Sequence, residues 1–146
     1  MSTLDRAGIA SRIPHHGNMC LLDSVASWSD TLIHCQASSH AALDNPLRAA
    51  GRLGMANGIE YAAQAMAVHG ALRAGADGAP RAGYLTSVRE VEFHAERLDL
   101  GTTPLDIHAE CLSGDGNHLI YSFRLETAGR LLITGRASVM LDAGAL

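Results

Sequence analysis

Glu60 is the residue with the clearest capacity for chemistry, because it is the one charged residue in a long apolar, alanine-rich stretch. Between Asn57 and Leu72 no other aspartate, glutamate, lysine or arginine occurs, and Gln64 follows one helical turn after Glu60. A carboxylate here is either an ordinary favourable charge near the positive end of a helix or a functional acid. An enclosed carboxyl is costly unless it is paired or protonated. Because protonation is what a general acid requires, we expect Glu60 to act as one.

Histidine is the natural partner of such an acid, and the sequence contains eight. His15 and His16 follow a proline and precede a glycine, in a predicted loop just before an apolar segment; a surface turn is the alternative interpretation. His69 lies on the same stretch as Glu60 but more than two helical turns away, which predicts that the two do not couple. The spacings typical of metal-binding histidines and Cys-x-x-Cys pairs do not occur, so neither a metal site nor a disulfide framework is predicted.

One helix and six strands must position these residues. The alanine-rich stretch predicts a helix over residues 55–73, enclosed by the protein because it lacks a charged face, with Asn57 as a candidate N-terminal cap. Alternation of apolar and polar residues predicts strands over residues 21–27, 32–37, 84–93, 105–111, 118–125 and 130–140. Turn-forming residues separate them, for example at 113–117. The order has no βαβ alternation, which indicates an α+β fold.

A single enclosed helix beside a long antiparallel sheet indicates the hotdog fold, in which an antiparallel β-sheet wraps around a long central helix. The 146 residues suit one domain, so we expect a single hotdog domain over residues 1–146. Half of such a helix usually needs a second subunit to cover the site beside it. The fold therefore predicts a dimer, which can be a homodimer or a heterodimer with another hotdog subunit.

Composition argues against several classes of function. The formal net charge of −4 is unfavourable for binding nucleic acid, which needs a basic face. No run approaches the roughly 18 apolar residues that would span a membrane. The N-terminal residues include charges and no apolar segment, so no signal peptide is predicted and we expect a cytoplasmic protein.

Two segments form a recognisable pattern: IPHHGNMCLLDSV at residues 13–25 and GIEYAAQAMA at residues 58–67. The first resembles the Leu-Pro-His-Arg-x-Pro-Phe/Met-Leu-Leu-x-Asp-x-Val opening of the 3-hydroxyacyl-[acyl-carrier-protein] dehydratases of fatty-acid synthesis. The second resembles the helix motif that carries their catalytic glutamate. Residues 83–85 followed by 91–93 are similar to the family's substrate-channel strand, and the resemblance spans about residues 12–140.

One departure from that family concerns the catalytic histidine. Typical members carry it in a Gly-His-Phe-Pro loop shortly before the helix glutamate, whereas residues 44–54 contain no histidine. The Pro-His start and the Gly-Ile-Glu-Tyr form look closer to a divergent bacterial branch that resembles dehydratases of aryl-polyene pigment clusters. In that branch the resemblance implies His15 as the base, with His16 as the alternative.

The resemblance implies an enzyme that dehydrates a 3-hydroxyacyl thioester on acyl carrier protein to the trans-2-enoyl thioester, in fatty-acid or aryl-polyene/polyketide-type biosynthesis. It implies His15 and Glu60 as catalytic residues and no cofactor beyond the phosphopantetheine of the carrier. The predicted substrate-binding residues are Gly58, Ile59, Gln64, His16, Gly83 and Leu85. The resemblance also implies an acidic carrier, so candidate docking residues are the arginines Arg48, Arg52, Arg81 and Arg89; a plain solvated charge is the alternative interpretation of each.

Two other functions fit the same sequence. A hotdog acyl thioesterase also uses a helix carboxylate, but delivers water to the thioester carbon. A non-catalytic subunit of a hotdog heterodimer would explain the missing Gly-His-Phe-Pro loop. The retained Glu60 argues against the second alternative, because an inactive subunit has no need of a costly carboxyl.

Overall fold

The alternating strands and the apolar helix assemble into a sheet packed on one helix. The structure is a computed structural model and describes residues 3–74, 83–99, 101–115 and 117–141. In chain order its elements are α1 (Arg6–Ala10), the 3-10 turn η1 (Gly17–Met19), β1 (Ser24–Trp28), β2 (Leu32–Ala37), η2 (Ser39–Ala41), η3 (Met55–Asn57), α2 (Gly58–Ala74), β3 (Gly83–Phe93), β4 (Leu105–Asp115), β5 (His118–Thr127) and β6 (Arg130–Leu141). The predicted helix and the six predicted strands are confirmed.

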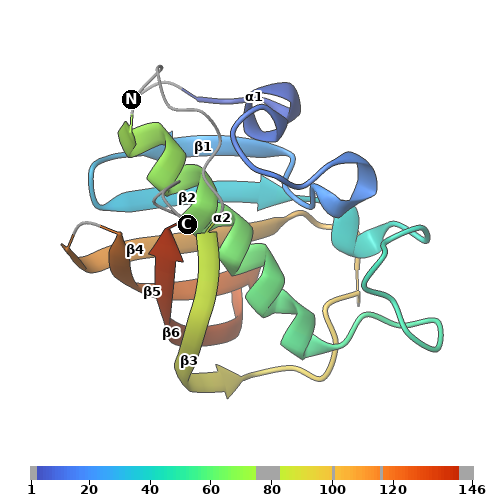
Figure 1. The fold of residues 1–146 in the computed structure, drawn as a ribbon. Helices are drawn as coiled ribbons and strands as arrows, with labels where there is room; N and C mark the ends of the chain where they lie inside the picture. Colours follow the sequence, from blue (N-terminus) through green and yellow to red (C-terminus); the bar gives the residue numbers. More distant parts are fainter. Residues whose placement is uncertain (1–2, 75–82, 100, 116, 142–146) are drawn as a thin grey trace.

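The six strands form one antiparallel sheet in the order β1-β2-β4-β5-β6-β3, and α2 lies across one face of it (Figure 1). Strand β5 shows why the helix covers this face: alternate residues of the strand, from Leu119 to Leu125, are buried on the side of the sheet that faces the helix, as the period-two pattern predicts. The predicted α+β hotdog architecture is therefore confirmed, with β1 and β3 at the two edges of the sheet.

The start of α2 differs from the sequence expectation. Asn57 belongs to the turn η3, and its side-chain amide donates to the Gly54 carbonyl at 3.2 Å. Because η3 runs directly into α2, the Gly58 N–H donates to the Met55 carbonyl of that turn. A Cβ on Gly58 would lie 3.2 Å from Leu125 Cδ2, so the glycine lets the helix begin close to the sheet. The capping role expected for Asn57 is thus wrong, because the turn occupies the place of a cap.

Gly135 in β6 leaves room for the Phe123 ring of the neighbouring strand. A Cβ on Gly135 would lie 2.7 Å from Phe123 Cζ and 3.1 Å from Val91 Cγ2. Because the added methyl group would have to displace the Phe123 ring or the strand, Gly135→Ala is expected to lower the free energy of unfolding by about 1–3 kcal/mol in urea denaturation. Gly101→Ala is the matched control, since nothing lies within 4 Å of its Cβ position. An equal loss in both variants would contradict this account.

His69, near the C-terminal end of α2, is fully buried and hydrogen-bonded at both ring nitrogens. Its Nε2 lies 2.8 Å from the Ser29 carbonyl and its Nδ1 lies 2.7 Å from the Tyr121 hydroxyl. A carbonyl only accepts, so Nε2 carries the proton and Nδ1 accepts from Tyr121. The ring is thus held in its neutral form, and burial lowers the pKa of His69.

This histidine is expected to make the folded protein less stable in mild acid. The unfolded chain binds a proton with the ordinary histidine pKa, whereas the folded chain does so only at lower pH. Stability is therefore complete above about pH 6.5 and falls below it, with a slope of up to about 1.4 kcal/mol per pH unit for each such group. Urea denaturation between pH 7.5 and 5 measures the slope, to which His40 and His108, whose pKa values burial also lowers, contribute. The slope should decrease in His69→Gln and stay unchanged in His118→Gln, an exposed control; the opposite pattern would contradict the assignment.

Candidate active site

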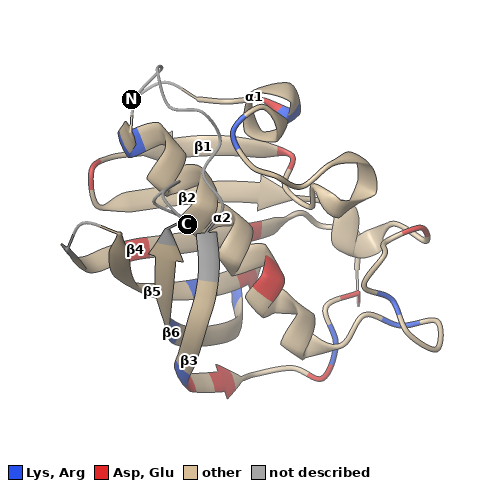
Figure 2. Ribbon diagram, viewed as in Figure 1, with Lys and Arg blue, Asp and Glu red and all other residues tan. Residues whose placement is uncertain are grey.

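His15 and Glu60 meet beside the N-terminal end of α2. The distance from His15 Nε2 to Glu60 Oε1 is 3.3 Å, and the two side chains are 27% and 37% exposed. In Figure 2, α2 has an acidic segment and, at its far end, a basic one, which agrees with Glu60 in its first turn and Arg73 in its last. The sequence predicted an enclosed carboxyl, and in this single chain that prediction is wrong. Glu60 lies on the same side of the helix as the half-buried Ile59, Ala63 and Ala67, which the sheet does not cover completely.

Gln64 connects Glu60 to the loop that carries His15. Its Oε1 accepts from the Leu21 N–H at 2.9 Å, and its Nε2 donates to the Met19 carbonyl at 2.7 Å. The same Nε2 lies 3.4 Å from Glu60 Oε1. The sequence left open whether Gln64 orients the carboxyl or satisfies nearby backbone, and the fully buried side chain contacts both.

The loop that carries His15 is tied down along its length. Met19 and Cys20 donate backbone hydrogen bonds to the His16 and Gly17 carbonyls, at 3.1 Å each, which closes the turn η1. Arg6 of α1 donates to the Gly17 carbonyl at 3.0 Å. The Nδ1 atom of His15 is enclosed and has no hydrogen-bond partner, which leaves Nε2 as the nitrogen beside Glu60.

A largely buried hydrogen-bond network of residues that the sequence did not predict lies next to Glu60. The Tyr61 hydroxyl lies 2.8 Å from Ser39 Oγ and accepts from Asn45 Nδ2 at 3.0 Å. Ser39 Oγ also donates to the Leu21 carbonyl at 2.7 Å. A polar-tipped tyrosine on an apolar helix was the available signal, because a buried tyrosine hydroxyl needs a partner.

Of the other predicted substrate-binding residues, His16 and Ile59 neighbour this pair in the chain, whereas Gly83 and Leu85 lie apart from it. His16 is exposed and precedes η1, and Ile59 is half-buried next to Glu60. Gly83 and Leu85 lie on β3, at the edge of the sheet opposite β1, whereas the His15 loop leads into β1. The Gly58 N–H already donates to the Met55 carbonyl of η3, so Gly58 does not offer the substrate a free N–H at the start of the helix.

The predicted docking arginines differ in their availability. Arg48 is only 14% exposed and pairs with the buried Asp99 at 2.8 Å, so the expectation that it is a docking residue is wrong. Arg97 binds the same carboxylate at 2.7 Å, and its guanidinium holds the pKa of Asp99 far below the usual range. Arg52 and Arg89 are exposed, and Arg81 lies outside the described residues.

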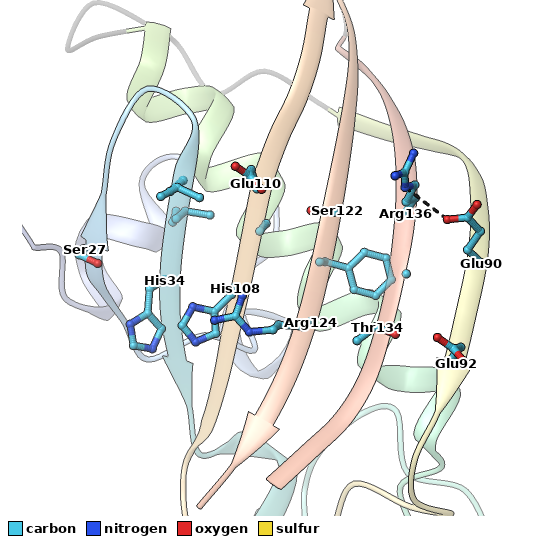
Figure 3. Close-up of a pocket in the computed structure, with 15 residues that line it drawn as sticks. Ser27, His34, Glu90, Glu92, His108, Glu110, Ser122, Arg124, Thr134 and Arg136 are labelled. Atoms are coloured by element: carbon cyan, nitrogen blue, oxygen red, sulfur yellow. Dashed lines mark ion pairs between the residues drawn. The ribbon is translucent and has the colours of Figure 1, made fainter. Parts of the chain in front are cut away.

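A cavity of about 580 Å³ lies on the other face of the sheet, away from α2 (Figure 3). His34 and His108 stack there, with ring centroids 4.2 Å apart. Each ring faces its own carboxylate: His34 Nε2 lies 2.7 Å from Asp106 Oδ1, and His108 Nε2 lies 3.3 Å from Glu126 Oε1. Neither His15 nor Glu60 lines this cavity.

Within the described ranges, no three His, Cys, Asp or Glu side chains are grouped so that they could hold a metal ion. In the same part of the chain, no helix has both the length and the hydropathy required to cross a bilayer.

Comparison with solved structures identifies a similar chain in the dehydratase heterocomplex ApeI:P from Xenorhabdus doucetiae. It is 28% identical over 92% of this chain and 90% of that chain, with a TM-score of 0.80. A hypothetical thioesterase from Streptococcus pneumoniae TIGR4, solved with coenzyme A, matches 81% of this chain and 84% of its own, with 12% identity and a TM-score of 0.58. A mutant thioesterase from Pseudomonas aeruginosa gives 11% identity over 82% and 80%, with a TM-score of 0.60. The two thioesterases share the fold alone.

No curated protein matches this chain. The sequence pattern of the ApeP-like family, described as ApeP dehydratase, matches residues 7–144, nearly the whole chain. This match confirms the resemblance to the divergent dehydratase branch. The chain belongs to the ApeP-like dehydratase family.

Proposed function

We propose that this chain dehydrates a 3-hydroxyacyl thioester carried on acyl carrier protein to the trans-2-enoyl thioester, in aryl-polyene biosynthesis. The observation that carries the proposal is the 3.3 Å contact between His15 Nε2 and Glu60 Oε1 in a chain of a dehydratase family. Imidazole and carboxyl are the two groups that acid–base elimination needs.

The elimination requires two proton transfers. His15 Nε2 removes a proton from C2 of the substrate, and the C2 electrons form the double bond to C3. The C3–O bond breaks as the protonated Glu60 carboxyl donates its proton, so the hydroxyl leaves as water. His15 is then cationic and Glu60 anionic. Their 3.3 Å contact allows the proton to return from His15 to Glu60, which restores the starting pair.

The surroundings support this division of roles. The positive end of α2 favours the negative charge that develops on Glu60 and on the thioester oxygen. Gln64 holds the Glu60 carboxyl from one side, while His15 approaches from the loop. Both groups are partly exposed, so an acyl chain has access to them in the single chain.

We also propose a second hotdog subunit as a partner, in addition to the carrier protein. One side of α2 stays half-exposed and apolar, at Ile59, Ala63 and Ala67. On the edge strand β3, Leu85 and Phe93 are 40% and 52% exposed. A surface of this kind is typical of one that another subunit covers. The relative from Xenorhabdus doucetiae occurs in a heterocomplex, which makes an ApeI-type subunit the first partner to test.

Mass spectrometry of a 3-hydroxyacyl carrier protein, incubated with this chain alone and with an ApeI-type subunit, tests the proposal. Loss of one water from the acyl group, dependent on Glu60, is the expected result. Release of the free acid would indicate a thioesterase instead. Dehydration that requires the partner but survives Glu60→Gln would make this chain a non-catalytic subunit and would refute the proposed mechanism.

A further inference from the structure

The half-buried Ser39 and the buried Asn45 and Tyr61 form a series of hydrogen bonds with a definite direction. The hydroxyl of Ser39 has one hydrogen, which it donates to the Leu21 carbonyl at 2.7 Å. Ser39 must therefore accept at its 2.8 Å contact with Tyr61, whose hydroxyl is the donor. Asn45 Nδ2 then donates to Tyr61 at 3.0 Å. Burial raises the pKa of Tyr61, so the phenol keeps the proton that this chain requires.

The chain of hydrogen bonds ends on a peptide group that is held from both sides. The Leu21 carbonyl accepts a hydrogen bond from Ser39 Oγ, and the Leu21 N–H donates to Gln64 Oε1 at 2.9 Å. Tyr61 and Gln64 belong to the first two turns of α2 and follow Glu60, Tyr61 as the next residue and Gln64 one helical turn later. The segment containing Leu21 is thereby fixed to the same part of the helix as the carboxyl.

His15 lies in that same loop, six positions before Leu21, and the turn η1 stiffens the connection between them. Asn45, where the hydrogen-bond chain starts, belongs to the segment 44–54 in which related dehydratases have a histidine loop. Asn18 Nδ2 donates to the Asp44 carbonyl at 3.1 Å, a second tie between the two segments. Segment 44–54, which lacks a histidine, is thus hydrogen-bonded to the loop that carries His15.

We propose that Ser39, Asn45 and Tyr61 are positioning residues that set the distance between His15 and Glu60, an inference that rests on the proposed function of that pair. In the hydrogen bonds of the described structure none of the three side chains bonds to His15 or Glu60; they act through Leu21 and the loop. Their removal is expected to alter the turnover step more than substrate binding, because acid–base catalysis depends strongly on geometry.

Ser39→Ala and Tyr61→Phe, assayed with any partner subunit that activity requires, test the proposal. Both are expected to lower kcat by about tenfold or more while KM changes by less than about twofold. Ser39→Thr keeps the hydroxyl and should retain most of the activity. Tyr121→Phe is the matched control, since it removes an equally buried hydroxyl that bonds His69 near the other end of α2. Equal kcat in Tyr61→Phe and Tyr121→Phe would overturn the proposal.

Nuclear magnetic resonance gives a readout that does not need activity. The ring resonances of His15 are expected to move in Ser39→Ala and in Glu60→Gln, and to stay in place in Tyr121→Phe. Unchanged His15 resonances in Ser39→Ala would overturn the positioning role even if kcat fell. An inactive wild type would refute the dehydratase proposal. The His15 resonances would still show whether Ser39 positions His15.

Discussion

Glu60→Gln is expected to lower kcat for dehydration by about 10²–10⁴-fold, the contribution typical of one general acid. Glutamine keeps the size and the hydrogen-bonding shape of the side chain but cannot donate a carboxyl proton to the leaving hydroxyl. The amide can still accept from Gln64 Nε2, which now lies 3.4 Å from the Glu60 carboxylate. The fold should therefore persist while the chemical step fails. Steady-state kinetics with a 3-hydroxyacyl carrier protein measures the loss.

Glu110→Gln serves as the control for this substitution. Glu110 is an exposed carboxylate on β4 and lines the cavity on the face of the sheet away from α2. The control should retain kcat within about twofold, the usual insensitivity of exposed positions to such changes. Full activity of Glu60→Gln would remove Glu60 from the reaction and leave the mechanism without its acid.

His15→Asn is expected to lower kcat by a similar factor, about 10²–10⁴-fold, because it removes the base that takes the C2 proton. Asparagine preserves a planar polar side chain without the ability to take a proton near neutral pH. Exogenous imidazole should restore part of the rate if only the base is missing. Single-turnover assays by mass spectrometry isolate this step from product release.

His118→Asn is the control, since His118 is exposed at the start of β5. His16→Asn distinguishes between the two adjacent loop histidines. A large loss in His16→Asn combined with normal activity in His15→Asn would transfer the base to His16. That result would also make the 3.3 Å contact of His15 with Glu60 incidental to the reaction.

The sequence predicted the elements of the fold well where side chains alternate regularly. Strand β4 shows where such prediction stops: alternation indicated residues 105–111, but the strand continues to Asp115. The pairing of β4 with β5 shifts between Cys111 and Ser113, and this irregularity interrupts the period-two pattern. The first strand begins at Ser24 instead of residue 21, because Leu21 bonds Gln64 rather than a neighbouring strand.

The site could be predicted in part. Glu60 stood out as a candidate because it is the one charge in an apolar stretch, whereas His15 became a candidate only through the resemblance to a family, because a histidine in a loop has no periodic signal. The degree of exposure of Glu60 was not predictable, since it depends on which side of α2 the sheet covers. Ser39 and Asn45 were missed because hydrogen bonds between loops distant in sequence leave no pattern in either segment.

The 3.1 Å hydrogen bond from Asn18 to the Asp44 carbonyl has a consequence for the dehydratase family. It joins the loop that carries His15 to segment 44–54, in which the dehydratases that this chain resembles carry their histidine. Under the proposed mechanism, the base therefore lies on a neighbouring segment of the chain. The absence of the usual histidine motif therefore does not by itself indicate an inactive protein in this family. Whether such a member has lost its activity needs a direct assay.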